Sequence, residues 1–334
     1  MGKNLKMVIC IFLFLLYFQQ QVDCSRYPLF NRLSLRRANA SGGEALAFNA
    51  RGGGPYTGVA DGRILRYRGH FLGWQDFATT SPMRNEKACD STNGSNAAMC
   101  GRVLGLGFDF LSGDLYAVDT HFGFQVIPQS GGLGIQLATG FNGANFTYPN
   151  ALDIDQVARE VYFTDAGKVF QTGNLAEIRR GRDNDGKVYR YNIETAKLTL
   201  LISNMSGPTG LAVSRDGRYL VISEYSRSRI RRFWLKGPNA LTSETLIRLS
   251  GNPENIKTTA RGDFWVAVTV PQPPPVQTTA AIAIRFNGLG RVLETINLTS
   301  EYSGDLISEV QEYFRRLYIA STASSFVGVS RVRP

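Results

Sequence analysis

The sequence contains few histidines and has little helical periodicity, and beyond its first residues it has no long apolar run. The two histidines, His70 and His121, are expected to be surface or core residues rather than catalysts. After residue 24 no stretch is both charge-free and near the roughly 20 residues that cross a bilayer, which excludes a spanning helix there. The lack of helical periodicity excludes a mainly helical fold.

The chain begins with a segment typical of a signal peptide. Lys3 and Lys6 precede an apolar run from Met7 to Phe18, and a polar stretch ends at Cys24. This order of charged, apolar and polar parts predicts a signal peptide over residues 1–24 and a mature protein starting near Ser25. We therefore expect the secretory pathway, with a final location in the vacuole or outside the cell.

Removal of this segment leaves a single pair of cysteines, Cys89 and Cys100. An even pair in an oxidising compartment is expected to form a disulfide. The residues between them are polar and rich in turn formers, so the bridge would order a loop that has little else to hold it. N-glycosylation sequons, which suit a secreted protein, begin at Asn39, Asn93, Asn145, Asn204 and Asn297.

Basic residues outnumber acidic ones, with 37 Lys and Arg against 27 Asp and Glu. The densest clusters, at residues 179–182 and 227–232, belong to no recognisable nucleic-acid module. Because the excess is otherwise spread along the chain, we interpret it as solvated surface and expect no nucleic-acid partner.

Short apolar strands recur between turn residues and predict an all-β fold. Six copies of one strand pattern are present: residues 56–59, 115–118, 161–164, 220–223, 264–267 and 317–320. Their spacing of about 50 residues is that of a four-stranded propeller blade. We predict that residues 25–334 form one domain, a six-bladed β-propeller of four-stranded antiparallel blades, and that the proline-rich residues 271–275 lie outside any central strand.

Several segments in a fixed order resemble the strictosidine synthase family of plants. They are residues 56–64, 100–102, 161–165, 223–226, 233–238, 251–257 and 311–319. The resemblance implies a six-bladed propeller of plant specialised metabolism, with a small-molecule pocket at one end of its axis. In the enzyme that names the family, this pocket condenses tryptamine with the aldehyde secologanin, and a carboxylate takes up the proton.

The family's catalytic residues are missing from the matching positions. Alignment through Gln311 and Glu312 places Ser308 at the catalytic glutamate and Leu306 at a histidine. Glu309 is the nearest carboxylate, but one step along a strand turns a side chain to the opposite face unless a bulge intervenes. The positions that match the indole pocket are Tyr148, Asn150, Arg179, Gly207 and Tyr225. We expect that the protein does not make strictosidine.

Two other functions stay open. The related calcium-dependent lactonases and esterases hold an axial metal, and Glu44, Asn150 and Glu254 resemble their ligands, which predicts a calcium site. Thr209 stands where those hydrolases place an asparagine, and Glu44 could instead pair with a basic neighbour such as Arg179. The third possibility is a propeller that binds a small molecule without catalysis.

Overall fold

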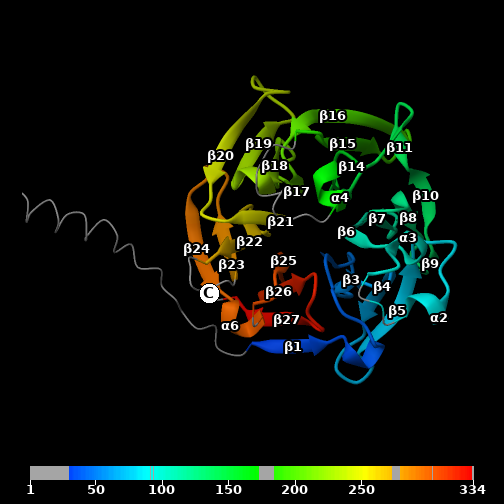
Figure 1. Cartoon of the computed structure of the whole chain (residues 1–334). Coiled ribbons are helices and arrows are strands. Elements are labelled where there is room, and N and C mark those ends of the chain that lie inside the picture. The colour runs from blue at the N-terminus through cyan, green and yellow to red at the C-terminus, as the bar shows by residue number, and fades with distance from the viewer. Residues whose placement is uncertain are drawn as a thin grey trace, which may run out of the picture.

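The computed structural model describes residues 30–90, 92, 94–172, 184–272, 279–302 and 304–332. They form six antiparallel blades around an axis, along which Figure 1 looks. The strands of each blade are given from the innermost outward. Blade 1 contains β2 (Leu46–Ala47), β3 (Tyr56–Gly58), β4 (Arg63–Tyr67) and β5 (Trp74–Thr79), and blade 2 contains β6 (Val103–Phe108), β7 (Leu115–Asp119), β8 (Gly123–Ile127) and β10 (Ile135–Ala138). Blade 3 contains β13 (Pro149–Asp155), β14 (Glu160–Asp165), β15 (Gly186–Asn192) and β16 (Lys197–Met205), and blade 4 contains β17 (Pro208–Val213), β18 (Tyr219–Glu224), β19 (Arg229–Trp234) and β20 (Ser243–Arg248). Blade 5 contains β21 (Asn252–Thr258), β22 (Phe264–Pro271), β23 (Thr279–Phe286) and β24 (Val292–Asn297), and blade 6 contains β25 (Ile307–Tyr313), β26 (Arg316–Ser321), β27 (Phe326–Arg331) and β1 (Asn31–Ser34).

The predicted fold class is confirmed. Each of the six recurring strands is the second strand of its blade: β3, β7, β14, β18, β22 and β26. These strands are apolar along their whole length because neighbouring blades cover both of their faces. In β7, for example, Leu115 and Ala117 pack toward blade 1 while Tyr116 and Val118 pack toward blade 3.

An apolar cluster fills the space between each pair of neighbouring blades. Between blades 5 and 6, for instance, Trp265 and Ala267 contact Val310 and Leu317. The core is therefore a ring of interblade layers that surrounds the axis, which leaves the axis itself free for polar side chains.

The ring is closed by the N-terminal strand. β1 pairs with β27 from Asn31↔Val329 to Ser34↔Phe326 and completes blade 6. Phe30 packs edge-on against Tyr302 and Phe326 beside this pairing. The two ends of the described chain thus share one blade, which couples the first and the last blade.

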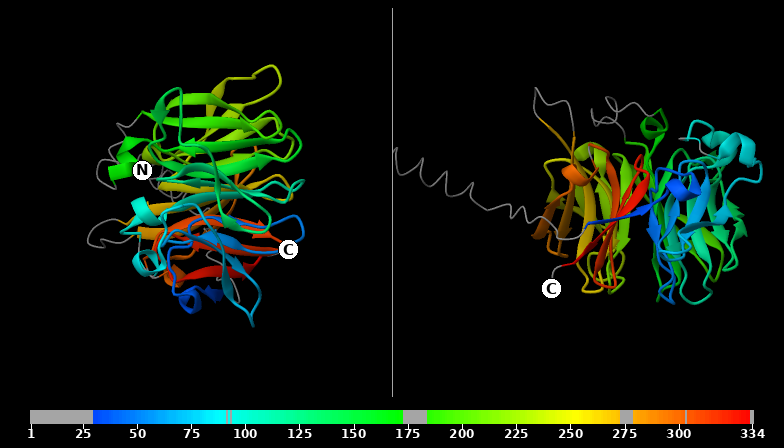
Figure 2. Two further views of the ribbon diagram at one scale, coloured as in Figure 1. Left: turned by 90° about the vertical axis from the view of Figure 1, so that its right-hand side faces the viewer. Right: turned by 90° about the horizontal axis from the view of Figure 1, so that it is seen from below.

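The two ends of the propeller differ, as the edge-on view in Figure 2 shows. One end, here called the helix face, carries α2 (Glu86–Cys89), α3 (Ala97–Cys100), α4 (Lys168–Thr172) and α6 (Thr299–Tyr302). The opposite end, the turn face, carries the turns that join first to second and third to fourth strands. The first strand of every blade runs from the helix face to the turn face.

The remaining short elements lie between blades. β9 (Gly132–Leu133) adds a parallel strand to β5, β11 (Gly140–Phe141) pairs with β12 (Ala144–Asn145), and η1 (Arg36–Ala38) and η2 (Tyr225–Arg227) are single turns. No helix in the described ranges is long and apolar enough to cross a membrane. Pro271 is the last residue of β22 and pairs with Thr279, so the ladder reaches the first proline of the proline-rich segment, and residues 273–278 lie outside the described ranges.

The predicted disulfide between Cys89 and Cys100 is confirmed, with a Cα–Cα distance of 5.5 Å. It joins the ends of α2 and α3, and both sulfur-bearing side chains are buried. The polypeptide continues directly from Cys100 into Gly101 and Arg102 at the axis. The bridge therefore anchors the segment that leads into the inner strand of blade 2.

Candidate functional site

Five of the six inner strands, all except β2, share an irregularity at the helix face. Their pairing register shifts between Val103/Gly105, Pro149/Leu152, Pro208/Gly210, Pro253/Ile256 and Ile307/Glu309. Such a bulge adds a residue to one strand and redirects its side chains. In each inner strand we count back two residues from the first aliphatic residue that pairs regularly with the second strand. This gives a position that corresponds from blade to blade. We call this set the axial ring: Glu44, Leu104, Asn150, Thr209, Glu254 and Ser308.

Glu44 of the axial ring is held by a cation from the next blade. Its Oε2 lies 3.2 Å from Nη2 of Arg102, and only 5% of the residue is exposed. Arg102 also donates to the carbonyl oxygen of Gly42, which fixes the guanidinium at this place. Burial raises the pKa of Glu44, and the charge of Arg102 counteracts this rise.

Glu254 is the second carboxylate of the axial ring, and it has no such partner. Within the described ranges no side chain or backbone group forms a hydrogen bond or ion pair with its carboxylate. The residue remains partly accessible, although it lies deep in the molecule. Burial raises the pKa of Glu254 well above its usual value, and the negative charge of Glu44 raises it further. The axis therefore holds a carboxyl group whose ionisation is disfavoured by burial and by the charge of Glu44.

An aromatic cluster lies beside the two carboxylates. The Phe170 ring of α4 contacts Tyr148 at a centroid distance of 6.1 Å and Tyr225 edge-on at 5.5 Å. Burial raises the pKa of Tyr148 to about 12, with a further contribution from the charge of Glu44. Gly207 has a φ of +60°, and a Cβ there would lie 2.4 Å from the Phe170 ring. Glycine at position 207 thus leaves room for the Phe170 ring to pack against this turn.

Ser308 takes the place where the family's catalytic glutamate is expected. It is 1% exposed, and its hydroxyl donates to the carbonyl oxygen of Glu44 at 2.7 Å. A hydroxyl used in this way links blades 6 and 1 and cannot act as a base. On the axial ring, Ser308 stands between Glu254 of blade 5 and Glu44 of blade 1.

Glu309 does not follow the strict alternation expected of a strand. Ser308 is the extra residue of the bulge, and both Ser308 and Glu309 form hydrogen bonds with blade 1, while Ile307 and Val310 pack in the apolar layer toward blade 5. The Glu309 carboxylate accepts a hydrogen bond from the backbone N–H of Leu46 at 2.9 Å. It also lies 3.4 Å from the ammonium of Lys257. Burial raises the pKa of Glu309 to about 7, although Lys257 opposes the rise.

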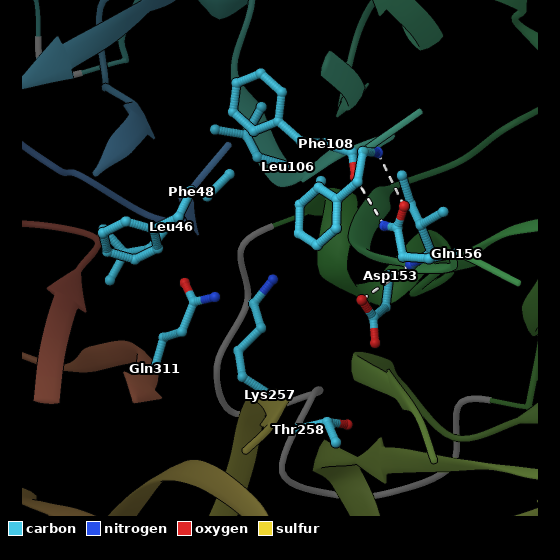
Figure 3. Close-up of a pocket in the computed structure, with 13 residues that line it drawn as sticks. Leu46, Phe48, Leu106, Phe108, Asp153, Gln156, Lys257, Thr258 and Gln311 are labelled. Atoms are coloured by element: carbon cyan, nitrogen blue, oxygen red, sulfur yellow. Dashed lines mark hydrogen bonds between the residues drawn. The ribbon is translucent and has the colours of Figure 1, made fainter. Parts of the chain in front are cut away.

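A small cavity of about 110 Å³ lies further along the axis, toward the turn face. Its apolar walls include Leu46, Phe48, Leu106 and Phe108, and Figure 3 shows Lys257 extending between them. Asp153 also lines this cavity, and its carboxylate accepts hydrogen bonds from the backbone N–H groups of Val213 and Ile154. Lys257 and Glu309 therefore stand between the axial ring and this cavity.

The structure brings most of the predicted site residues together. Asn150 is 5% exposed on the axial ring, and its side-chain amide has no hydrogen bond to any described residue. Leu306 is half-buried just before β25. Arg179 lies outside the described ranges, and Glu44 pairs with Arg102. His70 and His121 are exposed and lie in turns, His70 between β4 and β5 and His121 between β7 and β8.

Sequence reasoning missed Arg102, Phe170 and Lys257. Arg102 follows Gly101 just as Glu44 follows Gly43, so comparison of the blade starts could have found it. Phe170 lies between repeats and carries no pattern of its own. Lys257 stands three residues after Glu254, and only the ring of blades brings it to Glu309.

Comparison with known sequences identifies the family. The family model described as strictosidine synthase matches residues 150–238. Strictosidine synthase-like protein 11 of Arabidopsis thaliana is 35% identical over 322 residues, which cover 96% of this chain and 97% of that protein. Strictosidine synthase of Catharanthus roseus is 34% identical over 289 residues, covering 85% and 82%.

Solved structures show the same fold at low identity. A gluconolactonase from Xanthomonas campestris superimposes with a TM-score of 0.64 at 16% identity, over 91% of this chain and 89% of its own. A luciferin-regenerating enzyme gives a TM-score of 0.63 at 12% identity, over 92% and 97%. These likenesses concern the propeller alone. With the relatives of known sequence, the matching family model and the six-bladed fold taken together, this chain belongs to the strictosidine synthase family.

Proposed function

We propose that the axial ring binds a small organic amine and that Glu254 takes up its proton. The observation that supports this is the position of Glu254, a buried carboxylate without a partner in the described ranges, one blade away from the family's catalytic position. A protonated amine placed beside it would supply the missing positive charge. An acid whose pKa lies above its usual range is also a better proton acceptor near neutral pH.

The neighbouring aromatic cluster favours an aromatic amine. Tyr148 and Phe170 are partly exposed beside the carboxylate, and the buried Tyr225 supports the Phe170 ring edge-on. An ammonium group gains energy from such rings as well as from a carboxylate. The substrate class that fits is thus an amine carried by a flat apolar group.

The reaction that follows from this arrangement is condensation of the amine with a carbonyl compound. The ammonium loses a proton to Glu254, and the amine nitrogen attacks the carbonyl carbon to give a carbinolamine. Glu254 then returns the proton to the departing hydroxyl, so that loss of water gives an iminium ion and restores the carboxylate. If an aromatic carbon then closes the ring on the iminium carbon, the same carboxylate can accept the ring proton. The product differs from strictosidine because Ser308 and Leu306 replace the acid and the histidine of that pocket.

Isothermal titration with tryptamine, a simple aromatic amine, tests the binding step. Glu254→Gln should weaken tryptamine binding by roughly 10- to 100-fold, the usual worth of a charged hydrogen bond. Glu312→Gln is the matched control, because this glutamate is bound by the indole N–H of Trp265 at 3.3 Å. Equal affinities of wild type and Glu254→Gln would show the proposal to be wrong.

The calcium-dependent hydrolase is supported less well. Glu44, Asn150 and Glu254 do lie on one ring, but the guanidinium of Arg102 stands beside the first of them. The Thr209 hydroxyl donates to the carbonyl oxygen of Pro253 at 2.9 Å. No group of three or more His, Cys, Asp or Glu within the described ranges could hold a metal. The positive charge of Arg102 beside Glu44 would repel a calcium ion, so these residues do not fit the ion.

Turnover assays separate the remaining possibilities. Consumption of tryptamine with an aldehyde, lost in Glu254→Gln, would support condensation. Binding of tryptamine without any product would identify a non-catalytic binding protein. Cleavage of lactones or aryl esters that stops on addition of a chelator would favour the hydrolase and contradict the amine proposal.

We also propose that the protein follows the secretory route to the vacuole or the cell exterior, within plant specialised metabolism. The disulfide between Cys89 and Cys100 supports an oxidising compartment. The sequon residues Asn39, Asn145, Asn204 and Asn297 are all exposed, so their side chains are accessible to glycosylation, and Asn93 and residues 1–29 lie outside the described ranges. Mass spectrometry of the secreted protein before and after glycosidase treatment would test glycosylation and the start at Ser25.

A further inference from the structure

The turn face carries most of the strongly exposed apolar side chains. In the described ranges, each large apolar residue with more than 70% of its surface exposed lies in a turn at this end, and every blade contributes one. They are Phe71 (95%), Leu111 (80%), Val157 (93%), Leu241 (72%), Leu289 (84%) and Phe314 (77%). We call these residues the apolar tips. At the helix face, Met83 and Met99 in the loop between β5 and β6 are less exposed, at 59% and 43%.

Two of the apolar tips adopt a backbone conformation that their side chains disfavour. Leu241 has a φ of 65° and Phe314 a φ of 45°. Glycine and asparagine are the residues that ordinarily occupy such positions in hairpin turns. A leucine and a phenylalanine there cost stability and expose apolar surface at the same time. Residues that are unfavourable for folding at an exposed position are a reason to look for a binding role.

The turn face is basic in blades 1, 4, 5 and 6. The exposed charged residues of its turns are mostly cationic: Arg51, Arg68, Arg215, Arg218, Lys236, Arg261, Arg291 and Arg315. Against these, Glu194 and Asp216 are the exposed acidic residues of the described turns. The turn face therefore presents positive charge beside the apolar tips of blades 1, 4, 5 and 6, whereas the described turns of blades 2 and 3 at this face contain no exposed cation.

We propose that the turn face docks on an anionic lipid surface. The apolar tips would enter the region between headgroups and acyl chains, while the arginines lie against the lipid phosphates. Figure 2 shows these turns together along one edge of the propeller, so all six blades can reach a flat surface at once.

A lipid surface fits this pattern better than a protein partner does. The centre of a protein interface is a continuous apolar patch from which charged residues are depleted. Here the apolar tips stand one to a blade and are separated from one another, and the exposed Leu72 and Phe110 extend only the tips at Phe71 and Leu111. Leu289, for example, stands between Gly288 and Gly290, with Arg291 next along the chain. Docking in this way leaves the helix face, and with it the axial ring, directed toward the solvent.

Co-sedimentation with lipid vesicles tests the proposal, and it does not depend on the amine site. The wild-type protein should bind vesicles of phosphatidylcholine with phosphatidylserine, bind phosphatidylcholine alone weakly, and dissociate as salt is raised. Replacing all apolar tips should weaken binding at least about tenfold, because affinity scales with the apolar area inserted. The substitutions are Phe71→Ser, Leu111→Ser, Val157→Ser, Leu241→Asn, Leu289→Ser and Phe314→Asn.

Two controls keep the outcome clear. Leu241→Asn with Phe314→Asn should raise the melting temperature while lowering vesicle binding, which separates the binding effect from any folding defect. Met83→Ser with Met99→Ser removes exposed apolar groups from the helix face and should leave vesicle binding unchanged. If the wild type binds no vesicles at low salt, or if the variant without apolar tips binds them as the wild type does, the proposal is wrong. Vesicle binding that survives the loss of the apolar tips would show that the turn face binds polyanions through its charge alone.

Discussion

At the scale of single residues, the chemistry of the axis depends on which buried charges have partners. Glu44 has Arg102 and Glu309 has Lys257, whereas no described residue pairs with Glu254. Burying a charge without a partner is costly, and such costs are tolerated where a ligand supplies the missing charge. We therefore predict that substitution of Glu254 stabilises the folded protein, whereas substitution of Glu44 destabilises it.

Glu254→Gln is expected to stabilise the folded protein at neutral pH. Because the pKa of Glu254 is raised in the folded state, ionisation favours unfolding, and this loss of stability grows as pH rises above the usual pKa of a glutamate. The amide cannot ionise, so the variant should gain on the order of 1 kcal/mol at pH 7 and little near pH 4. Urea unfolding at both pH values measures the difference.

Glu44→Gln provides the comparison for this prediction. It leaves the guanidinium of Arg102 without its carboxylate, so it should destabilise the protein at pH 7. If both variants changed stability in the same direction, the assignment of paired and unpaired carboxylates would be wrong.

Lys257→Met should destabilise the protein in a pH-dependent manner. The substitution removes the cation that pairs with Glu309, and loss of one partner of a buried pair typically costs about 3–5 kcal/mol. The Glu309 carboxyl, with a pKa of about 7, can take up a proton instead, so the cost should be largest near pH 8 and small near pH 5. Thermal unfolding over this pH range would show it, and a constant difference would contradict the prediction.

At the scale of elements, the bulges and the disulfide loop position the site. The bulge at Ser308 turns Glu309 to the same side as the serine, a change that no strand pattern reveals. α2 and α3 have four residues each, and helices of that length are not stable alone. They rely on the bridge between Cys89 and Cys100 and on contacts with the blades.

Replacing both cysteines by serine should cost about 2–3 kcal/mol, the entropy released by opening a loop with a sequence separation of 11. Because the bridge leads directly into Arg102, we also expect faster amide hydrogen exchange over residues 84–102. Exchange measured by mass spectrometry tests this, and the turn at residues 259–263, on the opposite face, serves as the internal control. Unchanged protection of the segment would show that the blades alone hold it.

At the scale of the whole molecule, ring closure depends on a strand of four residues. β1 covers the edge of β27, and Trp74 donates its indole N–H to the carbonyl oxygen of Leu33 at 3.3 Å. Without β1 the edge of β27 is free to pair with other chains.

A chain that starts at Leu35 should therefore melt about 5 °C or more below one that starts at Ser25, and it should associate as concentration rises. Light scattering and calorimetry of the two chains measure both effects. A chain starting at Phe30 is the control, since it keeps β1 together with the contacts of Phe30. If all three chains behaved alike, closure by β1 would not be needed for stability.

Composition and periodicity alone predict the propeller, because each second strand is apolar on both sides and recurs with the size of a blade. The sequence likewise determines the disulfide, since only one cysteine pair follows the N-terminal segment. The sequence also relates Glu44, Asn150 and Glu254 as counterparts in successive blades, and Asn150 and Glu254 do lie at register shifts of their inner strands.

Only the tertiary structure decides which charges meet. Arg102 reaches Glu44, and Lys257 reaches Glu309, across blade boundaries that separate them by dozens of residues in sequence. The apolar tips likewise lie far apart in the chain and come to one face because every blade repeats the same up-and-down path. Pairing and exposure depend on the closing of the ring, and local sequence patterns carry no information on the distances that closure sets.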